Sequence, residues 1–240
     1  MSIFKYPTKL WSNMPNRSKE KFRTAYTVFD EFTNRNIFKL ISEGYFEGLE
    51  SPIAMGKEAN IFSAKKKDDS RVMVKIYRLE TCDFNKMYDY IKEDPRYAEL
   101  KGKKRLIIFS WVQREYRNLL KAKKAKVAVP EPLTFKNNIL VLEFIGQEGK
   151  IASRLTVEPP KYPKKFFNKI IDNIRKLYKA GLIHADLSPF NILNNNEEPV
   201  LIDFSQATPL DNTSAKEFLK RDIKNICNFF KKLGFFPKIR

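Results

Sequence analysis

The chain has 240 residues, 42% of them hydrophobic, which is enough to build a sizeable core and excludes an intrinsically disordered protein. Lys and Arg number 46 against 28 Asp and Glu, so the formal net charge of +18 predicts a polyanionic partner such as nucleic acid, a nucleotide or an anionic surface. The two cysteines, Cys82 and Cys227, match no metal-ligand spacing, and a single histidine excludes sites built on several histidines, so a disulfide scaffold and most zinc sites are excluded.

The beginning of the chain gives no targeting or membrane signal. Lys5, Pro7 and Lys9 precede any apolar signal region, and the longest apolar stretch, 106–112, is far short of the roughly 20 residues that cross a bilayer. We therefore expect a cytoplasmic protein with no membrane partner. Residues 1–24 are polar and without a sustained period, so we expect an extended or partly ordered arm there.

The next part of the sequence changes from a helical to a β-type pattern. Apolar side chains over 27–41 recur at helical spacing and predict one or two short helices, with Asn36 as a candidate N-cap and Gly44 as the stop. Short β-rich runs follow and predict an antiparallel sheet. These runs are 53–54, 60–64 and 71–77.

The middle of the chain is less uniform. Residues 79–104 have no clean period and stay unassigned, although loops this long inside compact domains are usually functional or mobile. Residues 109–124 predict a helix with a basic last turn. After it, 133–135 and 139–144 predict a hairpin turned by an Asn-Asn pair.

The C-terminal part is mostly helical in pattern. Residues 146–163 predict a connector, 163–180 a long amphipathic helix closed by Gly181, and 213–233 a last helix, with two short strands before it. A β-rich half therefore adjoins a helical half, which predicts an α+β fold. No internal repeat is visible.

The most informative pattern lies between the last two helices. His184-Ala-Asp186 is followed by Asn191 and, after an apolar strand, by Asp203, which is the H-x-D-x-x-x-x-N plus I-D-F pattern of kinase-like phosphotransferases. Phosphoryl transfer needs one carboxylate near the acceptor hydroxyl and two further oxygen ligands that hold Mg²⁺ on the phosphates. We assign the first role to Asp186 and the second to Asn191 and Asp203. Asp and Asn also form turns in many loops, but the combined spacing favours the site, and we expect His184 to be structural.

A site of this type also needs a lysine on the third strand and a glutamate on the next helix. Lys75 is flanked by alternating apolar residues on a predicted central strand, unlike a solvated edge lysine, and Glu115 lies where its partner belongs. In place of a glycine-rich loop, Gly56 and Lys57 stand between two predicted strands. This predicts a single tight turn and one lysine at the phosphates.

A series of short motifs carries a resemblance to a known family. In chain order they are G-K-E-A-N-I-F, V-K-I-Y, W-x-x-x-E-x-R-N-L, P-x-P, L-E-F-I-G, H-A-D-L-S-x-x-N and I-D-x-S-Q. Together they resemble the RIO family of atypical serine/threonine protein kinases, and within it the type-one subfamily in its short archaeal-like form. The resemblance covers about Asp30 to Leu233, and H-A-D-L-S and I-D-x-S-Q are highly specific.

The resemblance implies a two-lobed protein-kinase-like fold with a β-rich N-lobe, a helical C-lobe and short N-terminal helices, but without an activation loop or substrate-docking helices. We therefore expect four parts along the chain. They are an arm over 1–26, N-terminal helices over 27–48, the N-lobe over 49–145 and the C-lobe over 146–240. No A-P-E motif follows Asp203, in agreement with a missing activation loop.

The resemblance also implies an activity, that of a non-specific serine/threonine protein kinase with ATPase activity. It would use ATP with Mg²⁺, or with Mn²⁺, in the maturation of the small ribosomal subunit. Lys75 would contact the α- and β-phosphates and pair with Glu115, and the backbone of Glu143 and Ile145 would hold the adenine. Asp186 would be the catalytic carboxylate.

The remaining implied roles belong to the metal. Asn191 and Asp203 would bind it, and Asp203 would also act as the phosphate acceptor in an aspartyl-phosphate intermediate. Two places depart from the usual family pattern, because Pro189-Phe190 stand where Glu-Tyr is more usual and Phe204 where a smaller residue is common. Neither removes a catalytic group, but both bear on contacts with a protein substrate.

The positive charge is concentrated in one segment. Residues 96–126 contain eleven basic and two acidic residues with interleaved aromatic side chains, Lys103, Lys104 and Lys123 among them. We expect this segment to contact the rRNA of a precursor small-subunit particle through phosphates, without DNA specificity. Two alternatives stay open. One is a small-molecule phosphotransferase of the aminoglycoside-kinase type, which tends to be acidic, and the other is a basic pre-rRNA-binding scaffold with a vestigial nucleotide site.

Overall fold

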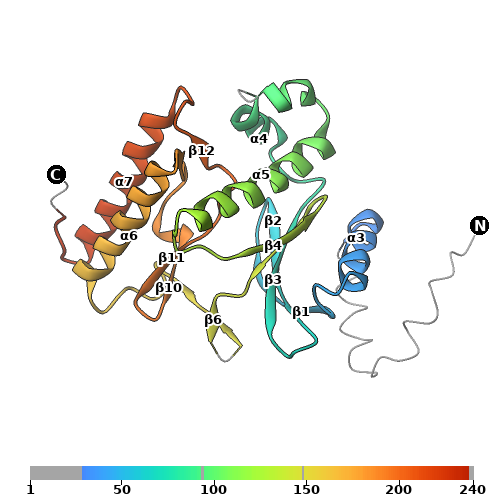
Figure 1. Cartoon of the computed structure of the whole chain (residues 1–240), viewed down its shortest axis with the longest axis horizontal. Helices are drawn as coiled ribbons and strands as arrows, with labels where there is room; N and C mark the ends of the chain where they lie inside the picture. The colour runs from blue at the N-terminus through green and yellow to red at the C-terminus, as the bar shows by residue number, and fades with distance from the viewer. Residues whose placement is uncertain (1–28, 93–94, 148, 238–240) are drawn as a thin grey trace, which may run out of the picture.

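The computed structural model describes residues 29–92, 95–147 and 149–237, so the arm expected over 1–26 lies outside the described residues. A β-sheet with flanking helices joins a mainly helical region, which is the two-lobed α+β arrangement that the sequence predicted (Figure 1). We call residues 29–145 the N-lobe and residues 146–237 the C-lobe.

The N-lobe sheet has five antiparallel strands in the order β1-β2-β3-β5-β4. The strands are β1 (Gly48–Met55), β2 (Ala59–Lys65), β3 (Arg71–Tyr77), β4 (Pro132–Lys136) and β5 (Ile139–Glu143). The predicted sheet and the β4–β5 hairpin are confirmed, although β1 begins five residues before the predicted run. Because β3 lies between β2 and β5, its successive side chains reach both faces of the sheet at its centre.

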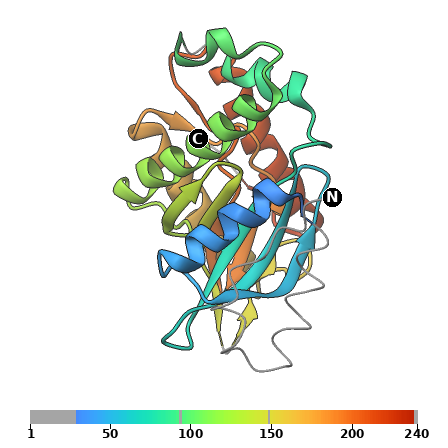
Figure 2. The same cartoon turned by 90° about the vertical axis from the view of Figure 1, so that its right-hand side faces the viewer.

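Helix α3 (Glu31–Ser42) covers one face of the sheet (Figure 2). Ile37 and Leu40 of α3 pack with Val72, Val74 and Ile76 of β3 in one buried cluster. The alternation of β3 therefore sends the side chains of Met73, Lys75 and Tyr77 to the opposite face. That face is covered by α5 (Lys104–Lys124), whose buried residues join the main core of the molecule.

The start of α3 differs from the prediction. Asp30 is the N-cap, because its carboxylate accepts the Thr33 amide at 3.0 Å and the Thr33 hydroxyl at 2.7 Å. Asn36, the predicted cap, lies inside the helix and is buried, where it donates to the Phe32 carbonyl and accepts from Asn137 in the β4–β5 turn. The predicted stop at Gly44 is confirmed, since Gly44 has φ +83°.

The unassigned segment 79–104 is not a loop. It contains α4 (Phe84–Ile91) and a 3₁₀ helix, η1 (Pro95–Leu100), and α5 begins at Lys104, five residues before the predicted start. Helix α4 is capped by Asp83, whose side chain accepts the Lys86 amide at 3.0 Å. Because α4 is so short, its buried side chains are too few to show a helical period in the sequence.

The C-lobe is built on two long helices that lie side by side (Figure 1). Its elements are β6 (Gly146–Gln147), β7 (Lys150–Ile151), β8 (Ser153–Arg154), α6 (Pro163–Lys179), β9 (Leu182–Ile183), the 3₁₀ helix η2 (Pro189–Asn191), β10 (Ile192–Asn195), β11 (Glu198–Leu201), β12 (Thr208–Pro209) and α7 (Ala215–Lys232). The predicted connector 146–163 therefore holds three two-residue strands, which are too short to give a pattern. Phe166 and Phe167 of α6 pack on Phe230 of α7, with ring centroids 6.5 and 5.3 Å apart.

The lobes also touch away from the strand connection. The ring of Tyr90 in α4 stacks on Phe218 of α7, with centroids 6.1 Å apart. The same ring meets Trp111 of α5 edge to face, with centroids 6.0 Å apart. The Arg114 guanidinium of α5 donates to the Tyr90 carbonyl and to the Ala207 carbonyl of the C-lobe, both at 3.0 Å. Helix α4 is therefore attached to both lobes at the end of the molecule away from β6, as both views show.

Candidate active site

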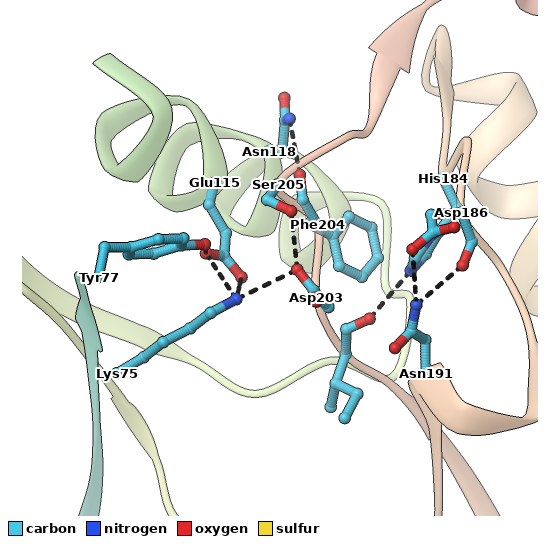
Figure 3. A network of polar contacts seen from close by, with 11 residues as sticks. Lys75, Tyr77, Glu115, Asn118, His184, Asp186, Asn191, Asp203, Phe204 and Ser205 are labelled. Carbon is cyan, nitrogen blue, oxygen red and sulfur yellow. Dashed lines mark hydrogen bonds and ion pairs between the residues drawn. The ribbon is translucent and has the colours of Figure 1, made fainter. Parts of the chain in front are cut away.

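A buried lysine lies at the centre of the candidate site (Figure 3). Lys75 projects from β3 toward α5, is 7% exposed, and its Nζ lies 2.8 and 3.0 Å from the two carboxylate oxygens of Glu115. Tyr77, two residues along the same face of β3, donates its hydroxyl to Glu115 Oε2. The sequence predicted this lysine–glutamate pair, and the structure brings it together.

The same ammonium reaches a second carboxylate from the C-lobe. Lys75 Nζ lies 3.1 Å from Asp203 Oδ1, and Ser205 donates its hydroxyl to the same oxygen at 2.8 Å. Asp203 has φ +64°, a left-handed conformation that non-glycine residues rarely adopt. Its side chain remains 40% exposed, so Oδ2 is left for a further ligand.

The charges of this cluster set its protonation. Burial would raise the pKa of Asp203, but the Lys75 ammonium and the Ser205 hydroxyl hold that pKa at about 2. Burial opposes the charge of Lys75, yet Asp203 and Glu115 together hold its pKa well above the usual value. Burial raises the pKa of the Glu115 carboxyl, against the pull of the Lys75 ammonium. Lys75 and Asp203 are thus charged at neutral pH.

Asp186 and Asn191 lie together in the loop between β9 and β10. The Asn191 amide nitrogen donates to the Asp186 carbonyl at 2.9 Å and to its Oδ2 at 3.1 Å. This leaves the Asn191 amide oxygen for another ligand. Burial, followed by the charge of Asp203, raises the pKa of Asp186.

Helix α7 holds the loop that carries Asp186. The Asp222 carboxylate accepts the Ala185 amide at 2.9 Å and the Leu187 amide at 3.0 Å, on either side of Asp186. Ala185 itself has φ +61°. Burial raises the pKa of Asp222 to about 7. Two backbone bonds thus fix a strained loop so that the Asp186 side chain faces the site.

His184 is structural, as the sequence predicted. Its Nε2 lies 3.0 Å from the Ile202 carbonyl, and its ring packs on Phe204 with centroids 4.7 Å apart. Burial lowers the pKa of His184 to about 4, so the ring is neutral under ordinary conditions and donates from Nε2. It therefore links the Asp186 loop to the Asp203 loop.

Two residues of α5 that the sequence reading missed hold the Asp203 loop. The Asn118 amide nitrogen donates to the Phe204 carbonyl at 3.0 Å and to the Ala207 carbonyl at 2.9 Å, and Arg114 also binds the Ala207 carbonyl. Asn118 lies three residues after Glu115, so both project from one face of the helix. That spacing is the signal that could have singled it out.

The turn that the sequence predicted to meet the phosphates lies between β1 and β2. Gly56 donates its amide to the Ala59 carbonyl at 3.0 Å, and a Cβ at Gly56 would lie 2.8 Å from that oxygen, so a glycine is needed there. Lys57 is exposed at the tip and does not join the cluster. Glu58 was not predicted, but burial and the charge of Asp203 raise the pKa of its carboxyl, which places it near the site.

The predicted adenine-binding residues lie where β5 leads into the C-lobe. Ile145 is buried, and its amide donates to no backbone carbonyl among the described residues, while its carbonyl accepts the Ala152 amide at 2.9 Å. The Glu143 side chain instead accepts the Glu131 amide at 3.0 Å. The Glu143 amide also donates to the Glu131 carbonyl at 2.8 Å, and the adenine contact of these two residues stays a prediction.

The oxygen atoms of the site fit a magnesium ion. Asp203 Oδ2 and the Asn191 amide oxygen are hard donors left over by the hydrogen bonds above, and no group of three or more His, Cys, Asp or Glu gathers anywhere in the described residues. Mg²⁺ is usually held by one or two protein oxygens together with substrate phosphates and water. The donor set is therefore of the right kind and number.

No helix within 29–92, 95–147 and 149–237 has the length and hydropathy needed to cross a membrane.

Comparison with known proteins identifies the family. The model of the RIO domain matches residues 60–239. The chain is similar to the RIO-type serine/threonine-protein kinase Rio1 of Haloferax volcanii, with 38% identity over 91% of this chain and 75% of that protein. It is also similar to the Rio1 kinase of Methanocaldococcus jannaschii, with 39% identity over 89% of this chain and 73% of that protein.

A solved structure has the same fold. The Rio2 kinase of Chaetomium thermophilum, in a complex described as ADP/Mg²⁺-phosphoaspartate, superposes with a TM-score of 0.68 at 22% identity, over 85% of this chain and 62% of that one. At that identity the likeness shows the fold. The sequence matches show more, because they span most of both chains at more than a third identity: the protein belongs to the RIO family and is a RIO-type serine/threonine-protein kinase of the Rio1 type.

Proposed function

We propose that this kinase binds ATP with Mg²⁺, hydrolyses it through a phosphorylated Asp203, and acts in the maturation of the small ribosomal subunit. The observation that carries the catalytic part is the Lys75 ammonium, held between Glu115 of the N-lobe and Asp203 of the C-lobe. A permanently charged lysine at the meeting point of both lobes is suited to the phosphates of a nucleotide that lies between them.

Each residue of the site has its own role in this proposal. Lys75 would bind the α- and β-phosphates, and the Ile145 amide would bind the adenine. Asp203 and Asn191 would hold Mg²⁺, which neutralises charge on the phosphates when bound. Asp186, with its raised pKa, would orient an attacking hydroxyl or water and accept its proton.

The aspartyl-phosphate step uses Asp203 Oδ2, the same oxygen that would hold Mg²⁺. Oδ2 would attack the γ-phosphorus, the bond from that phosphorus to the β–γ bridging oxygen would break, and ADP would leave. Water, losing a proton to Asp186, would then attack the phosphorus of the acyl phosphate, the bond from phosphorus to Oδ2 would break, and inorganic phosphate would leave. The carboxylate is then free again, so the sum is ATP hydrolysis. The Rio2 complex, described as a phosphoaspartate, supports this route by analogy.

The ribosomal part of the proposal depends on charge and family. The net charge of +18 and the basic residues of 96–126 suit a polyanionic partner, and rRNA in a precursor small-subunit particle is the partner that the family resemblance implies. The family match also favours a protein kinase over a small-molecule phosphotransferase.

Two conservative variants test the catalytic assignment. Asp186→Asn keeps the shape but loses the acceptor charge, so nucleotide and Mg²⁺ should still bind while ATP turnover falls by about 10²-fold or more. Asp203→Asn should instead weaken Mg²⁺ binding. Both are measured by calorimetry and ATP turnover, with Asp211→Asn as an exposed control on the same segment.

A chemical test separates the two routes of phosphate transfer. Wild-type protein incubated with ATP should carry an acid-stable phosphate that base and hydroxylamine remove, and Asp203→Asn should lack it. A label that resists hydroxylamine would contradict the aspartyl phosphate and leave the kinase assignment standing. Turnover that small-subunit particles do not change would argue against the ribosomal role.

A further inference from the structure

A second concave surface lies outside the nucleotide site. A groove of about 760 Å³ runs between the C-terminal end of α5, residues 127–129, α6 and the start of β11. It is lined by Lys123, Lys126, Lys165, Lys169 and Lys176, by Asn168 and Asn173, by Asp172 and Glu198, and by Val127, Ala128, Val129 and Pro199. None of the residues assigned above to ATP or Mg²⁺ lines it.

The lysines of this groove are only partly neutralised. Lys176 pairs with Asp172 at 2.7 Å, and Lys169 pairs with Glu198 and also donates to the Glu197 carbonyl. Lys126 and Lys165 have no acidic partner among the described residues, and both are exposed. The groove therefore holds a positive charge that the protein itself leaves without a counter-ion.

Lys126 stands in an unusual backbone conformation. Helix α5 ends in a Schellman motif, in which the Val127 amide binds the Ala122 carbonyl at 3.1 Å and the Lys126 amide binds the Lys123 carbonyl at 2.9 Å. Lys126 is the left-handed residue of this motif, with φ +59°, a position that usually carries glycine. A lysine kept at a strained position, with its side chain in a groove, points to a function for that side chain.

The side chain of Asn173 adds a second donor. Asn173 of α6 is 5% exposed, and its Oδ1 accepts the Ala128 amide at 3.2 Å. The structure gives its amide nitrogen no acceptor among the described residues, and Asn173 lines the groove. The nitrogen is not among the fully buried polar atoms that lack a partner, so it reaches the groove surface and can donate to a ligand that accepts hydrogen bonds.

We propose that this groove, defined by the lining residues given above, binds the sugar-phosphate backbone of RNA. Its free groups are ammonium and amide donors, which suit phosphate oxygens, and no aromatic side chain lines it for base stacking. An acidic protein would need apolar anchors, and the only apolar side chains here are small, with Val127 and Val129 buried. The binding is therefore led by phosphates and indifferent to sequence.

This inference rests on the rRNA-binding part of the proposed function and assigns the RNA contact to a different surface. The sequence placed the RNA contact along 96–126 with Lys103, Lys104 and Lys123. The groove uses only the C-terminal end of that segment and takes most of its donors from α6.

The test is a salt titration of RNA binding with the full-length chain. The probe is a fluorescently labelled single-stranded RNA of mixed sequence, with purified small-subunit rRNA as a second probe. The double variant Lys126→Gly/Lys165→Gln removes the two unpaired cations. The control, Lys66→Gln/Lys67→Gln, removes the same charge from the β2–β3 turn, where Lys67 is exposed and Lys66 is half-buried and lies 3.5 Å from Asp68.

We expect the groove variant to lower the slope of log affinity against log salt by about 1.4, because each lost phosphate contact on a single strand contributes about 0.7. At 0.1 M salt this corresponds to a loss of about 25-fold in affinity. The control pair should change the slope little. ATP turnover without RNA should be the same in both variants as in the wild type.

Folding is separated from binding by the single variant Lys126→Gly. Glycine relieves the left-handed strain, so its melting temperature should equal or exceed that of the wild type while RNA binding weakens. If the wild type binds RNA and the groove variant keeps the full slope of log affinity against log salt, the RNA contact lies elsewhere. That result would overturn the groove proposal and leave the proposed function standing. A wild type that binds no RNA would overturn the rRNA partner as well, and displacement of RNA by polyglutamate as readily as by competitor RNA would assign the groove to an acidic protein.

Discussion

The ion pair between Lys75 and Glu115 joins two residues that would each be costly to bury alone. Glu115 is 1% exposed, and the remaining partner of its carboxylate in the structure is the Tyr77 hydroxyl. Removal of one member of such a buried pair leaves the other uncompensated, which costs far more than removal of both. In the proposed function Lys75 also binds phosphates, so we expect the pair to link stability to nucleotide binding.

We predict that Lys75→Met lowers the free energy of unfolding by about 3 to 5 kcal/mol, because Glu115 is left buried without a cation. The double variant Lys75→Met/Glu115→Gln should recover most of that loss. Both variants should have almost no ATP turnover, since neither has a charge for the phosphates. Denaturant unfolding and ATP turnover measure the two effects. If Lys75→Met kept turnover within about twofold of the wild type, the assignment of Lys75 would be wrong.

His184 gives a prediction about pH. In the unfolded chain its pKa is near 6.5, whereas burial lowers it to about 4 in the folded protein. Between these values the unfolded state binds more protons than the folded state, so stability falls as the pH drops through this window. Because the chain has one histidine, a single imidazole signal in an NMR titration reports this residue, and its midpoint should be about 4.

The control for this prediction is His184→Gln. Asp222, whose pKa is raised to about 7, acts in the opposite sense. Its contribution to the free energy of unfolding is lost as the pH rises from about 4 to 7. The difference in unfolding free energy between the wild type and His184→Gln cancels this contribution. That difference should shrink as the pH falls from 6.5 to 4, and an imidazole midpoint near 6.5 would show that the ring is solvated.

At the scale of elements, α5 positions both sides of the site. Glu115 holds the N-lobe lysine, while Asn118 holds the carbonyls of Phe204 and Ala207 in the C-lobe. Asp203, with its strained φ of +64°, lies immediately before this anchored stretch. The bonds from Asn118 therefore help to keep the Asp203 carboxylate turned toward Lys75.

We predict that Asn118→Ala lowers the unfolding free energy by about 1 to 3 kcal/mol and raises the Mg²⁺ concentration at half-maximal ATP turnover. The first effect comes from two lost hydrogen bonds and the second from a looser Asp203 loop. Arg117→Ala, an exposed neighbour on α5, is the control. A variant that lost stability but kept the Mg²⁺ dependence of the wild type would reduce Asn118 to a structural residue.

The predictability of the elements depends on how local their signals are. The sequence predicted the β-hairpin, the helix ends at Gly44 and Gly181 and the two C-lobe helices. Turn residues and long periodic patterns depend only on residues close together in the chain. Asn36 was wrongly taken as a cap because its role is to bind Asn137, a residue far away in the chain. Helix α4 had too few buried side chains to be recognised.

The same distinction applies to the site. Lys75, Glu115, Asp186, Asn191 and Asp203 have fixed spacings and neighbours, so the sequence could single them out, and the structure gathers them. Asn118 and Asp222 bind backbone groups of other segments. Every residue type has a backbone carbonyl and nearly every one an amide, so no residue pattern identifies these partners in the sequence. The roles assigned to all these residues stay predictions until the variants above are measured.

At the scale of the whole molecule, the two lobes meet along α5, at the passage from β5 to β6, and at the stack of Tyr90 on Phe218. Arg114 supports this stack and also binds the C-lobe. We predict that Tyr90→Ala/Phe218→Ala speeds the release of a fluorescent ADP analogue, measured by stopped flow. Tyr178→Ala, an exposed tyrosine on α6, should release it at the wild-type rate, and equal rates for all three proteins would contradict the prediction.

The contacts of α5 with both lobes limit how the lobes can move. Glu115 of α5 binds Lys75 of β3, while Arg114, Asn118 and Lys121 donate to carbonyls of the C-lobe, so a rigid swing of one lobe against the other would break these bonds together. The contacts of Tyr90 depend on the short helix α4 and a few rings, and far fewer bonds are lost when α4 alone moves. We therefore expect α4, rather than a whole lobe, to be the part that shifts when a nucleotide enters or leaves.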